Sequence, residues 1–504
     1  MKNTFLIALF LSLFVGSKIY AQNSGLLEKD SLDRYIYQAM EAWKIPGAAV
    51  CILKDGEILL QKGYGVSNWD TKNKIDEQTI FPIASISKTF TGTLFATLEA
   101  DSIISLDDLV KKWLPYFSMK DKLVEQQITL TDILSHRSGW KTFQGDLLNT
   151  ESSMGFQLMI EKFTLQTPAY PIRTKFGYSN FGFMIAGESI KNITRQDYNT
   201  YLRSRLLEPL GMKRTYVFVE EIKNERNKVD GHTIVNDTLI ILPPDKEKPY
   251  SHGGIYASVN DLGIWVKTLL NNGNLNGNNV IPESAINKMW QSHTIIGKAR
   301  AADRQSYFKT YGLGWEIMQY QNVEVINHGG AYAGALASIT LVPSIGLGIV
   351  ILTNQDAHML QETLKWQVVD AFLGKAASNY TLNTIERHNK RKVESRNLAL
   401  EVEKDKEAFG INPDSIIGTY ECEYYGKATI KRVKNNYVLS LEFHPTIQGV
   451  LSPFKKEQLT CTYNHPMFGK VQFPFVIENK QVKSFTLFVD SFIESDGYEF
   501  RKVE

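Results

Sequence analysis

The spacing of hydrophobic and polar residues changes along this chain, and each spacing predicts a different element. Between residues 47 and 64, two apolar runs flank Lys54-Asp55-Gly56-Glu57, and Asp-Gly in that position favours a tight hairpin turn. Apolar residues then recur at helical spacing from Pro82 to Ala100, which predicts a helix with one buried face. The residues of that face are Phe90, Leu94, Phe95 and Leu98.

Apolar segments at both ends of residues 22–385 predict a single sheet with a helical insertion. Leu32 to Trp43 is expected to be a helix, and the region from about Leu106 to Lys288 is expected to be mostly helical with long loops. Later strands are expected at Val323–Ile326, Ala337–Val342 and Leu347–Leu352, followed by a helix at Glu362–Leu373. We therefore predict an α+β fold, in which helices flank an antiparallel sheet made from both ends of this region.

The last quarter of the chain follows a different pattern. Residues 386–410 are dense in charge and poor in glycine, which indicates a solvated helical linker. Residues 411–504 form short runs rich in Tyr, Phe and Val, such as Ala428–Val433 and Tyr437–Phe443 around Lys434-Asn435-Asn436. A similar pair, Val471–Ile477 and Val482–Val489, follows. This pattern predicts a separate, small antiparallel β domain of the barrel type.

The first 21 residues have the pattern of a secretory signal peptide. Lys2 precedes an apolar run from Phe5 to Val15, and a small residue, Ala21, marks the expected cleavage site. That run is too short to span a bilayer as a stable helix, although an uncleaved anchor stays as the alternative. We therefore expect a secreted protein, periplasmic or extracellular, whose first domain begins at residue 22.

Composition narrows the possible partners of the chain. The net charge is +2 over 504 residues, which gives no indication of nucleic-acid binding. After signal removal we expect no membrane span, because no later apolar run is long enough to cross a membrane. We also expect no metal, because no cluster has the ligand spacing of a zinc site, and no cofactor. Of the three cysteines, Cys51 is expected to be buried, and pairing of Cys422 with Cys461 is left open, as is the oligomeric state.

Ser85-Ile86-Ser87-Lys88 is the first candidate for chemistry. A Ser-x-x-Lys spacing also occurs at Ser138, Ser306 and Ser452, but only Ser85 follows Pro82 and opens a predicted helix. A helix N-terminus favours negative charge on the hydroxyl, and Lys88 three residues later can reach the same oxygen. If buried, its amine can lose its proton and act as a base. The alternative is a capping serine with a surface lysine.

Tyr178-Ser179-Asn180 and His328-Gly329-Gly330 are the other two candidates. The first lies on a predicted turn before an apolar segment, so Tyr178 and Asn180 can point into one cavity. A lysine ammonium beside the phenol of Tyr178 is expected to depress its pKa, so that it can relay a proton. The glycines after His328 let a substrate backbone approach the strand edge. The alternatives are a capping Asn with a core Tyr, and a structural His.

These motifs, in this order, make the chain resemble the serine β-lactamase and penicillin-recognising hydrolase family. The resemblance is to its class C-like branch, which includes D-alanyl-D-alanine carboxypeptidases, D-aminopeptidases and carboxylesterases. It covers roughly Leu27 to Lys375, and residues from about Ile411 resemble the small lipocalin-like β domain of some members. Supporting segments are Ile128–Trp140, Leu207–Met212, His252–Leu262, Tyr311–Trp315 and His328–Asn354.

The resemblance implies a role for each candidate residue. It makes Ser85 the acylated nucleophile, Lys88 and Tyr178 the proton-handling pair, and Asn180 a contact of both substrate and lysine. The backbone N–H groups of Ser85 and Ala331 would form the oxyanion hole, with Ala331 directly after Gly329 and Gly330 on an edge strand.

One departure from the family pattern affects the expected substrate. His328 stands where many relatives have the Lys of Lys-Thr-Gly, and neither that string nor Ser-Asp-Asn occurs in this chain. A mostly neutral histidine is a poorer partner than lysine for the carboxylate of a β-lactam. The sequence therefore favours a hydrolase acting through an acyl-enzyme on a D-amino-acid peptide, a peptidoglycan fragment or a small ester. Weak β-lactamase activity and a catalytically silent cell-wall-peptide binding protein are the alternatives. A third hypothesis makes the β domain a lid or docking module that sets substrate access.

Overall fold

The computed structural model describes residues 29–235, 237–243, 250–297, 308–375, 379–390, 394 and 407–503. The predicted signal peptide, residues 1–21, lies outside these residues, and so does most of the predicted linker, residues 386–410. None of the helices in the described part of the chain is long and apolar enough to cross a membrane.

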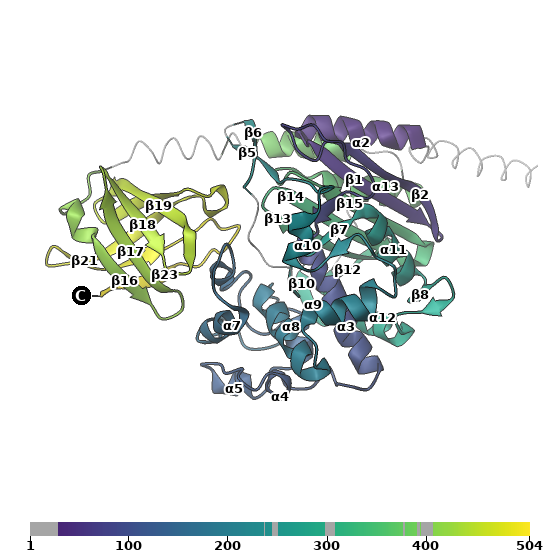
Figure 1. The fold of residues 1–504 in the computed structure, drawn as a ribbon, viewed down its shortest axis with the longest axis horizontal. Helices are drawn as coiled ribbons and strands as arrows, with labels where there is room; N and C mark the ends of the chain where they lie inside the picture. Colours follow the sequence, from purple (N-terminus) through teal and green to yellow (C-terminus); the bar gives the residue numbers. More distant parts are fainter. Residues whose placement is uncertain are drawn as a thin grey trace, which may run out of the picture.

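An eight-stranded antiparallel sheet forms the centre of the first domain (Figure 1). The N-terminal hairpin lies beside the last strand of the domain, because β1 pairs with β15 as well as with β2. This arrangement confirms the predicted α+β fold with a sheet from both ends of the region. In spatial order the strands are β10 (Thr294–Gly297), β11 (Lys309–Tyr311), β12 (Glu316–Tyr320), β13 (Val323–Tyr332), β14 (Ala335–Val342), β15 (Leu347–Thr353), β1 (Gly47–Lys54) and β2 (Glu57–Gly65).

Alternate residues of β1 pack into two separate apolar cores. Ala48, Val50 and Ile52 join the core that contains α2 (Lys29–Trp43) and α13 (Leu360–Phe372). The residues between them join a larger core that contains α11 (Val259–Leu270). Because helices cover both faces of the sheet, the strand is a continuous apolar run rather than an alternating one.

A helical insertion separates β2 from β10 and carries most of the candidate site. Its helices are α3 (Ser87–Ala100), α4 (Val110–Trp113), α5 (Lys122–Glu125), α6 (Leu130–Leu134), α7 (Phe156–Thr164), α8 (Asn180–Thr194), α9 (Tyr198–Leu202), η4 (Arg203–Leu207), α10 (Val219–Asn224), α11 and α12 (Glu283–Met289), with the 3₁₀ turns η2 (Ala84–Ile86) and η3 (Asp146–Leu148). Three small sheets accompany them, formed by β3 (Ile80–Pro82), β7 (Tyr256–Ser258) and β4 (Thr215–Tyr216), by β5 (His232–Val235) and β6 (Thr238–Ile241), and by β8 (Asn274–Leu275) and β9 (Asn278–Asn279).

Helix α3 differs from the amphipathic helix that its spacing predicted. It begins at Ser87 rather than at Pro82, and its residues from Ser87 to Leu98 are buried on every side. The polar side chains of the second face are buried threonines that donate to backbone carbonyls, as Thr91 does to Ser251 O at 2.6 Å. Such hydrogen bonds make a polar face compatible with a core position, so the expectation of a single buried face was wrong.

The second domain is a closed barrel of eight antiparallel strands, which confirms the predicted all-β architecture. Aromatic side chains fill its interior, among them Phe473, Phe485 and Phe500. Cys422 and Cys461 are buried free thiols, so they do not pair. The strands are β16 (Gly418–Cys422), β17 (Gly426–Val433), β18 (Asn436–Leu441), β19 (His444–Lys455), β20 (Gln458–Tyr463), β21 (Lys470–Glu478), β22 (Gln481–Leu487) and β23 (Tyr498–Val503), with the 3₁₀ turns η6 (Pro413–Ile416) and η7 (Pro466–Phe468).

The barrel lies against the helical insertion, on the side of α7 (Figure 1). Lys162 of α7 donates to the backbone oxygen of Glu423 at 2.9 Å. The two domains are therefore in direct contact, although residues 395–406 between them are outside the described part of the chain.

Candidate active site

Ser85 lies in the 3₁₀ turn η2, between β3 and helix α3. The residue before it, Ala84, has a positive φ of 47°, a strained conformation for a residue with a Cβ. Strand β13 comes close to this turn at Gly330, where an added Cβ would lie 2.2 Å from Ile83 O. The glycine at position 330 thus allows the strand edge and the serine to share one side of a cleft.

Lys88 is fully buried directly beneath Ser85. Its Nζ donates to Ser85 Oγ at 3.0 Å, to Asn180 Oδ1 at 2.7 Å and to the backbone oxygen of His252 at 2.6 Å. Three acceptors from three parts of the chain therefore fix the position of the amine. The structure brings the first two sequence motifs together at this one nitrogen.

Asn180 is the first residue of helix α8, whose cap is Ser179. The Ser179 hydroxyl accepts from Gly182 N at 3.1 Å. This capping hydrogen bond fixes the start of α8 at Asn180. While Oδ1 of Asn180 accepts from Lys88, its Nδ2 donates to Asp146 Oδ2 at 2.6 Å. Asp146 thereby holds the amide in the orientation that presents oxygen to the lysine.

Asp146 is itself unusual, because it is a carboxyl group in an almost fully buried position. Burial, and after it the negative charge of Glu494, raise the pKa of Asp146 to about 8, although the hydrogen bond from Asn180 acts in the other direction. At neutral pH this side chain is therefore mostly the uncharged acid. No sequence motif marked it.

Tyr178 faces Ser85 from the turn before α8, with the Lys88 Nζ 5.0 Å from its ring centroid. Burial raises the pKa of Tyr178 above its ordinary value, and its hydrogen bond with Ser85 offsets only part of that rise. The expectation of a depressed pKa was therefore wrong in direction, since desolvation of the phenolate outweighs the neighbouring groups. Tyr178 is a neutral phenol in this structure.

His136, a buried histidine to which the sequence analysis gave no role, packs against the ring of Tyr178. The His136 ring lies 4.3 Å from the Tyr178 ring, and its Nδ1 accepts from Ser179 N at 3.0 Å. Its backbone has a positive φ of 57°, a conformation that needs support from its surroundings.

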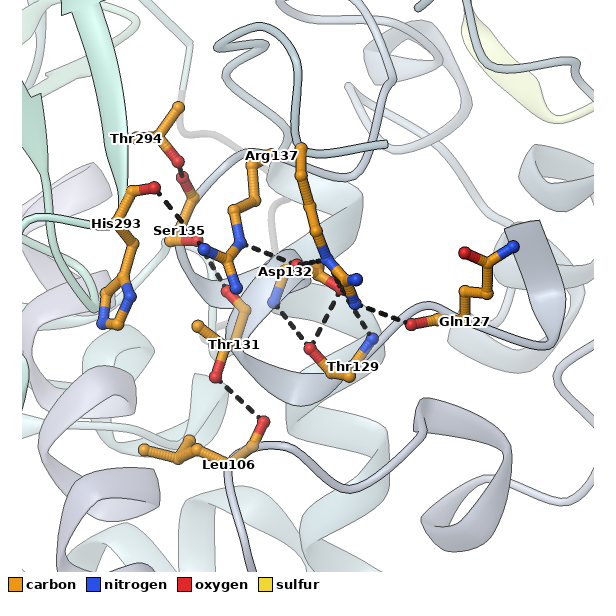
Figure 2. A network of polar contacts seen from close by, with 10 residues as sticks. Leu106, Gln127, Thr129, Thr131, Asp132, Ser135, Arg137, His293 and Thr294 are labelled. Atoms are coloured by element: carbon orange, nitrogen blue, oxygen red, sulfur yellow. Dashed lines mark hydrogen bonds and ion pairs between the residues drawn. The ribbon is translucent and has the colours of Figure 1, made fainter. Parts of the chain in front are cut away.

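Figure 2 shows the polar network that holds the loop carrying His136. Buried Asp132 accepts from Arg137 Nε at 2.6 Å and from Arg173 at 2.8 Å, and it closes a capping box with Thr129 at the start of α6. Thr294 of β10 donates to Ser135 O at 2.9 Å. These contacts tie the loop to the edge of the sheet, and so they fix the residue that packs on Tyr178.

His328 lies within β13, the strand that comes close to the Ser85 turn at Gly330. Its Nδ1 is 2.6 Å from Gly329 O, which can only accept, so the proton belongs on Nδ1 and Nε2 accepts from Tyr311 OH at 2.8 Å. Burial, and next the neighbouring Lys88, lower the pKa of His328 to about 3. The ring is therefore neutral, and both of its nitrogens already have partners inside the protein.

The edge of β13 that follows His328 faces the cleft. Strand β12 pairs with β13 only as far as Asn327. On the other side, Tyr332 pairs with Ala335 across a two-residue turn, so this pair is hydrogen bonded and the preceding pair, Ala331 with Leu336, is not. The N–H of Ala331 consequently points away from β14, toward the side of Ser85.

These side chains line a cavity of about 390 Å³. Every candidate residue except the buried Lys88 lines it: Ser85, Tyr178, Asn180, His328, Gly329, Gly330 and Ala331. The sequence analysis did not identify Asp146 or three residues of the barrel that line the cavity, Met467, Phe492 and Ile493. It also did not identify His136, which packs on Tyr178. In the part of the chain that the structure describes, no group of His, Cys, Asp and Glu side chains is suited to hold a metal ion.

Comparison with known proteins places the chain in a family. A sequence model of the Beta-lactamase family matches residues 32–372. The chain therefore belongs to the Beta-lactamase family, whose members are generally serine hydrolases.

Individual relatives extend this comparison. The protein flp of Staphylococcus aureus (strain MW2) is 27% identical over 356 residues, which cover 68% of this chain and 67% of that protein. The unguisins hydrolase ungD' of Aspergillus campestris is 26% identical over 332 residues, which cover 63% of this chain and 60% of that protein.

A solved structure is similar over both domains. The octameric penicillin-binding protein homologue from Pyrococcus abyssi has a TM-score of 0.60 and 20% identity, and the match covers 94% of this chain and 100% of that one. At this identity the likeness is one of fold.

Proposed function

We propose that this protein hydrolyses an amide or ester bond through an acyl-enzyme on Ser85. The observation that carries the proposal is the position of the Lys88 amine, 3.0 Å from the Ser85 hydroxyl and held by two other acceptors. A neutral amine has two N–H groups and one lone pair. If Asn180 Oδ1 and His252 O take the two N–H groups, the lone pair faces the hydroxyl of Ser85, as a general base requires.

The first half of the reaction then follows from this geometry. Ser85 Oγ attacks the carbonyl carbon and gives its proton to Lys88, and the carbonyl oxygen becomes an oxyanion between the N–H groups of Ser85 and Ala331. Collapse of this intermediate breaks the bond to the leaving group. Tyr178, a neutral phenol next to Ser85, passes a proton from the Lys88 side to the departing amine or alkoxide.

The second half returns the enzyme to its starting state. A water molecule attacks the acyl carbon and gives its proton to the same lysine and tyrosine pair, and the ester bond to Ser85 breaks. Ser85 recovers its proton and the acid is released. Asn180, fixed by Asp146 through one Nδ2–H, can donate its second Nδ2–H to the carbonyl oxygen of a substrate.

For the substrate we propose a D-amino-acid peptide, a peptidoglycan fragment or a small ester. The neutral state of His328 supports this choice over a β-lactam, because both nitrogens have internal partners and offer no cation to a carboxylate. The relative named as an unguisins hydrolase is consistent with hydrolytic chemistry on this fold. We further propose that the protein is secreted to the periplasm or the extracellular space after cleavage following Ala21.

The test is intact-protein mass spectrometry of the mature chain after exposure to a fluorophosphonate probe. We expect one stoichiometric adduct that is lost in Ser85→Ala and kept in Ser452→Ala, a matched change at another Ser-x-x-Lys spacing on the barrel. The mass of the unlabelled chain reports cleavage after Ala21 in the same experiment. Correctly folded protein without an adduct would favour the alternative of a silent binding protein.

A further inference from the structure

The barrel reaches the cavity of the other domain mainly through the loop of residues 488–497, which joins β22 to β23, and also through η7. Phe492 and Ile493 of this loop line the cavity together with Met467 of η7. Ile493 is buried, whereas the Phe492 side chain is 51% exposed and stands at the mouth. One wall of the cavity beside Ser85 therefore belongs to the second domain.

The next residue of the loop, Glu494, enters the first domain and is 1% exposed. Its carboxyl group accepts from Gly145 N at 2.6 Å and from Leu147 N at 3.2 Å. Gly145 is the N-cap residue of the 3₁₀ turn η3. Because glycine has no side chain, the N–H groups at the start of this turn receive no hydrogen bond from a capping side chain of the turn itself. Glu494 supplies that cap from about 350 residues away, and Tyr425 and Tyr498 of the barrel donate to the same carboxyl group.

The segment that Glu494 holds is the one on which the candidate site depends. Asp146, between the two backbone donors, accepts from Asn180, and Asn180 accepts from Lys88. Phe143 in the same segment donates its backbone N–H to Tyr178 O at 2.8 Å. The hydrogen bonds of Glu494 and of Asp146, joined by the backbone of residues 145–147, thus connect the barrel to the amine beneath Ser85.

Further contacts fix the barrel against the same segment. Lys141 Nζ lies 2.9 Å from Asp496 Oδ1, and His444 Nε2 donates to Leu147 O at 2.8 Å. On the far side of η3, Ser153 N donates to Phe443 O at 2.8 Å. The barrel therefore binds residues 141–153 through hydrogen bonds and an ion pair at several points along the segment.

We infer that the barrel is a working part of the active site: residues 488–497 form a specificity-determining wall of the cleft, and Glu494 is a positioning residue that acts through Asp146 on Asn180. This inference rests on the proposed function, because it concerns the same serine and the same cleft. It extends that function to the second domain, for which the family model has no counterpart.

The wall is tested with Phe492→Ala and a series of p-nitrophenyl esters of increasing acyl length. We expect the ratio of kcat/KM for long and short esters to change by about tenfold, because a large apolar side chain at the mouth is removed. Val476→Ala is the matched control, since Val476 is also on the barrel and is 48% exposed but lies outside the cavity. An unchanged ratio in Phe492→Ala would overturn the role of the wall. Because Phe492 is exposed, we expect this variant to fold even if the variants of the buried Glu494 do not.

The positioning role is tested with Glu494→Gln and Glu494→Ala in the full-length protein. We expect the rate constant for fluorophosphonate labelling of Ser85, and kcat rather than KM, to fall about tenfold to a hundredfold in Glu494→Ala, because small displacements of a positioned group cost about that much. Glu494→Gln, which keeps one acceptor oxygen, should recover part of the loss. Glu499→Gln, on β23 and bonded to Ser484 and Arg501, is the control.

The outcomes separate this inference from the proposed function. If the wild-type protein is not labelled at all, both are wrong. If it is labelled and the Glu494 variants only lower the melting temperature, with kcat of the folded protein unchanged, Glu494 is structural and the positioning role is wrong while the proposed function stands.

Discussion

At the scale of single residues, the candidate site depends on groups that the protein keeps uncharged. His328 has its pKa lowered to about 3 and Asp146 has its pKa raised to about 8, and burial is the main cause in each case. Neutral groups can serve both as donors and as acceptors, so they orient the lysine and the amide without adding a competing ion pair.

The raised pKa of Asp146 has a measurable consequence for stability. Between its ordinary value of 3.8 and about 8, the folded state holds a proton that the unfolded state releases, so the free energy of unfolding falls as pH rises. The slope from this one group is at most about 1.4 kcal/mol per pH unit. Glu494, with a pKa raised to about 6 by burial, has the same sign but only below that value.

We therefore expect Asp146→Asn to flatten the pH dependence of stability between pH 6 and 8, where Glu494 no longer contributes. Urea unfolding of wild-type and variant protein at pH 6, 7 and 8 measures this difference. The control is Asp496→Asn, a partly exposed carboxylate of the same interface. An equal slope in wild type and Asp146→Asn would show that Asp146 is ionised throughout this range.

At the scale of elements, apolar spacing predicted the strands β1, β2, β13, β14 and β15 and the barrel, because such spacing shows which face of a segment is buried. It did not predict β10, β11 and β12 of the same sheet. Ser85 with Lys88, and Tyr178 with Asn180, could be found from local spacing as well, since each pair is two or three residues apart. Asp146 and Glu494 could not, because their positions depend on packing between segments about 350 residues apart. The polar face of α3 misled the prediction because its threonines are satisfied by backbone oxygens that the pattern does not contain.

Strand β13 provides a direct test of how the elements fit together. An added Cβ at Gly330 would lie 2.2 Å from Ile83 O, whereas at Gly329 the nearest atom is 3.9 Å away. We expect Gly330→Ala to destabilise the protein by about 1–3 kcal/mol and to slow labelling of Ser85, because the strand must move away from the turn. Gly329→Ala should cost less than about 0.5 kcal/mol. Chemical unfolding of both variants measures this, and equal effects would contradict the close approach.

At the scale of the whole molecule, the two domains share one cavity and are joined by buried hydrogen bonds that meet on residues 145–147. We expect the barrel to stay bound to the first domain after the connection is cut, because Glu494, His444 and Asp496 hold residues 141–153 independently of it. A specific protease site introduced within residues 395–406 allows this test. Size-exclusion chromatography should show both fragments in one peak that still reacts with the fluorophosphonate probe.

The matched control for this cleavage carries Glu494→Ala in addition, and its fragments should separate more readily. If the fragments of the otherwise unchanged protein separate and the first fragment reacts as fast as the intact protein, the barrel is dispensable.

The pairing of β1 with β15 has a consequence for the order of events during synthesis. Strand β1 cannot pair with β15 until β15 has been synthesised, about 300 residues later, as the register of Ala48 with Thr353 shows. Long-range pairing of this kind slows folding. The cleft gains its barrel wall only when residues 492–494 have been synthesised, well after β15. The complete cleft therefore forms only after both domains have been made, and a chain that holds the first domain alone lacks one wall of its site.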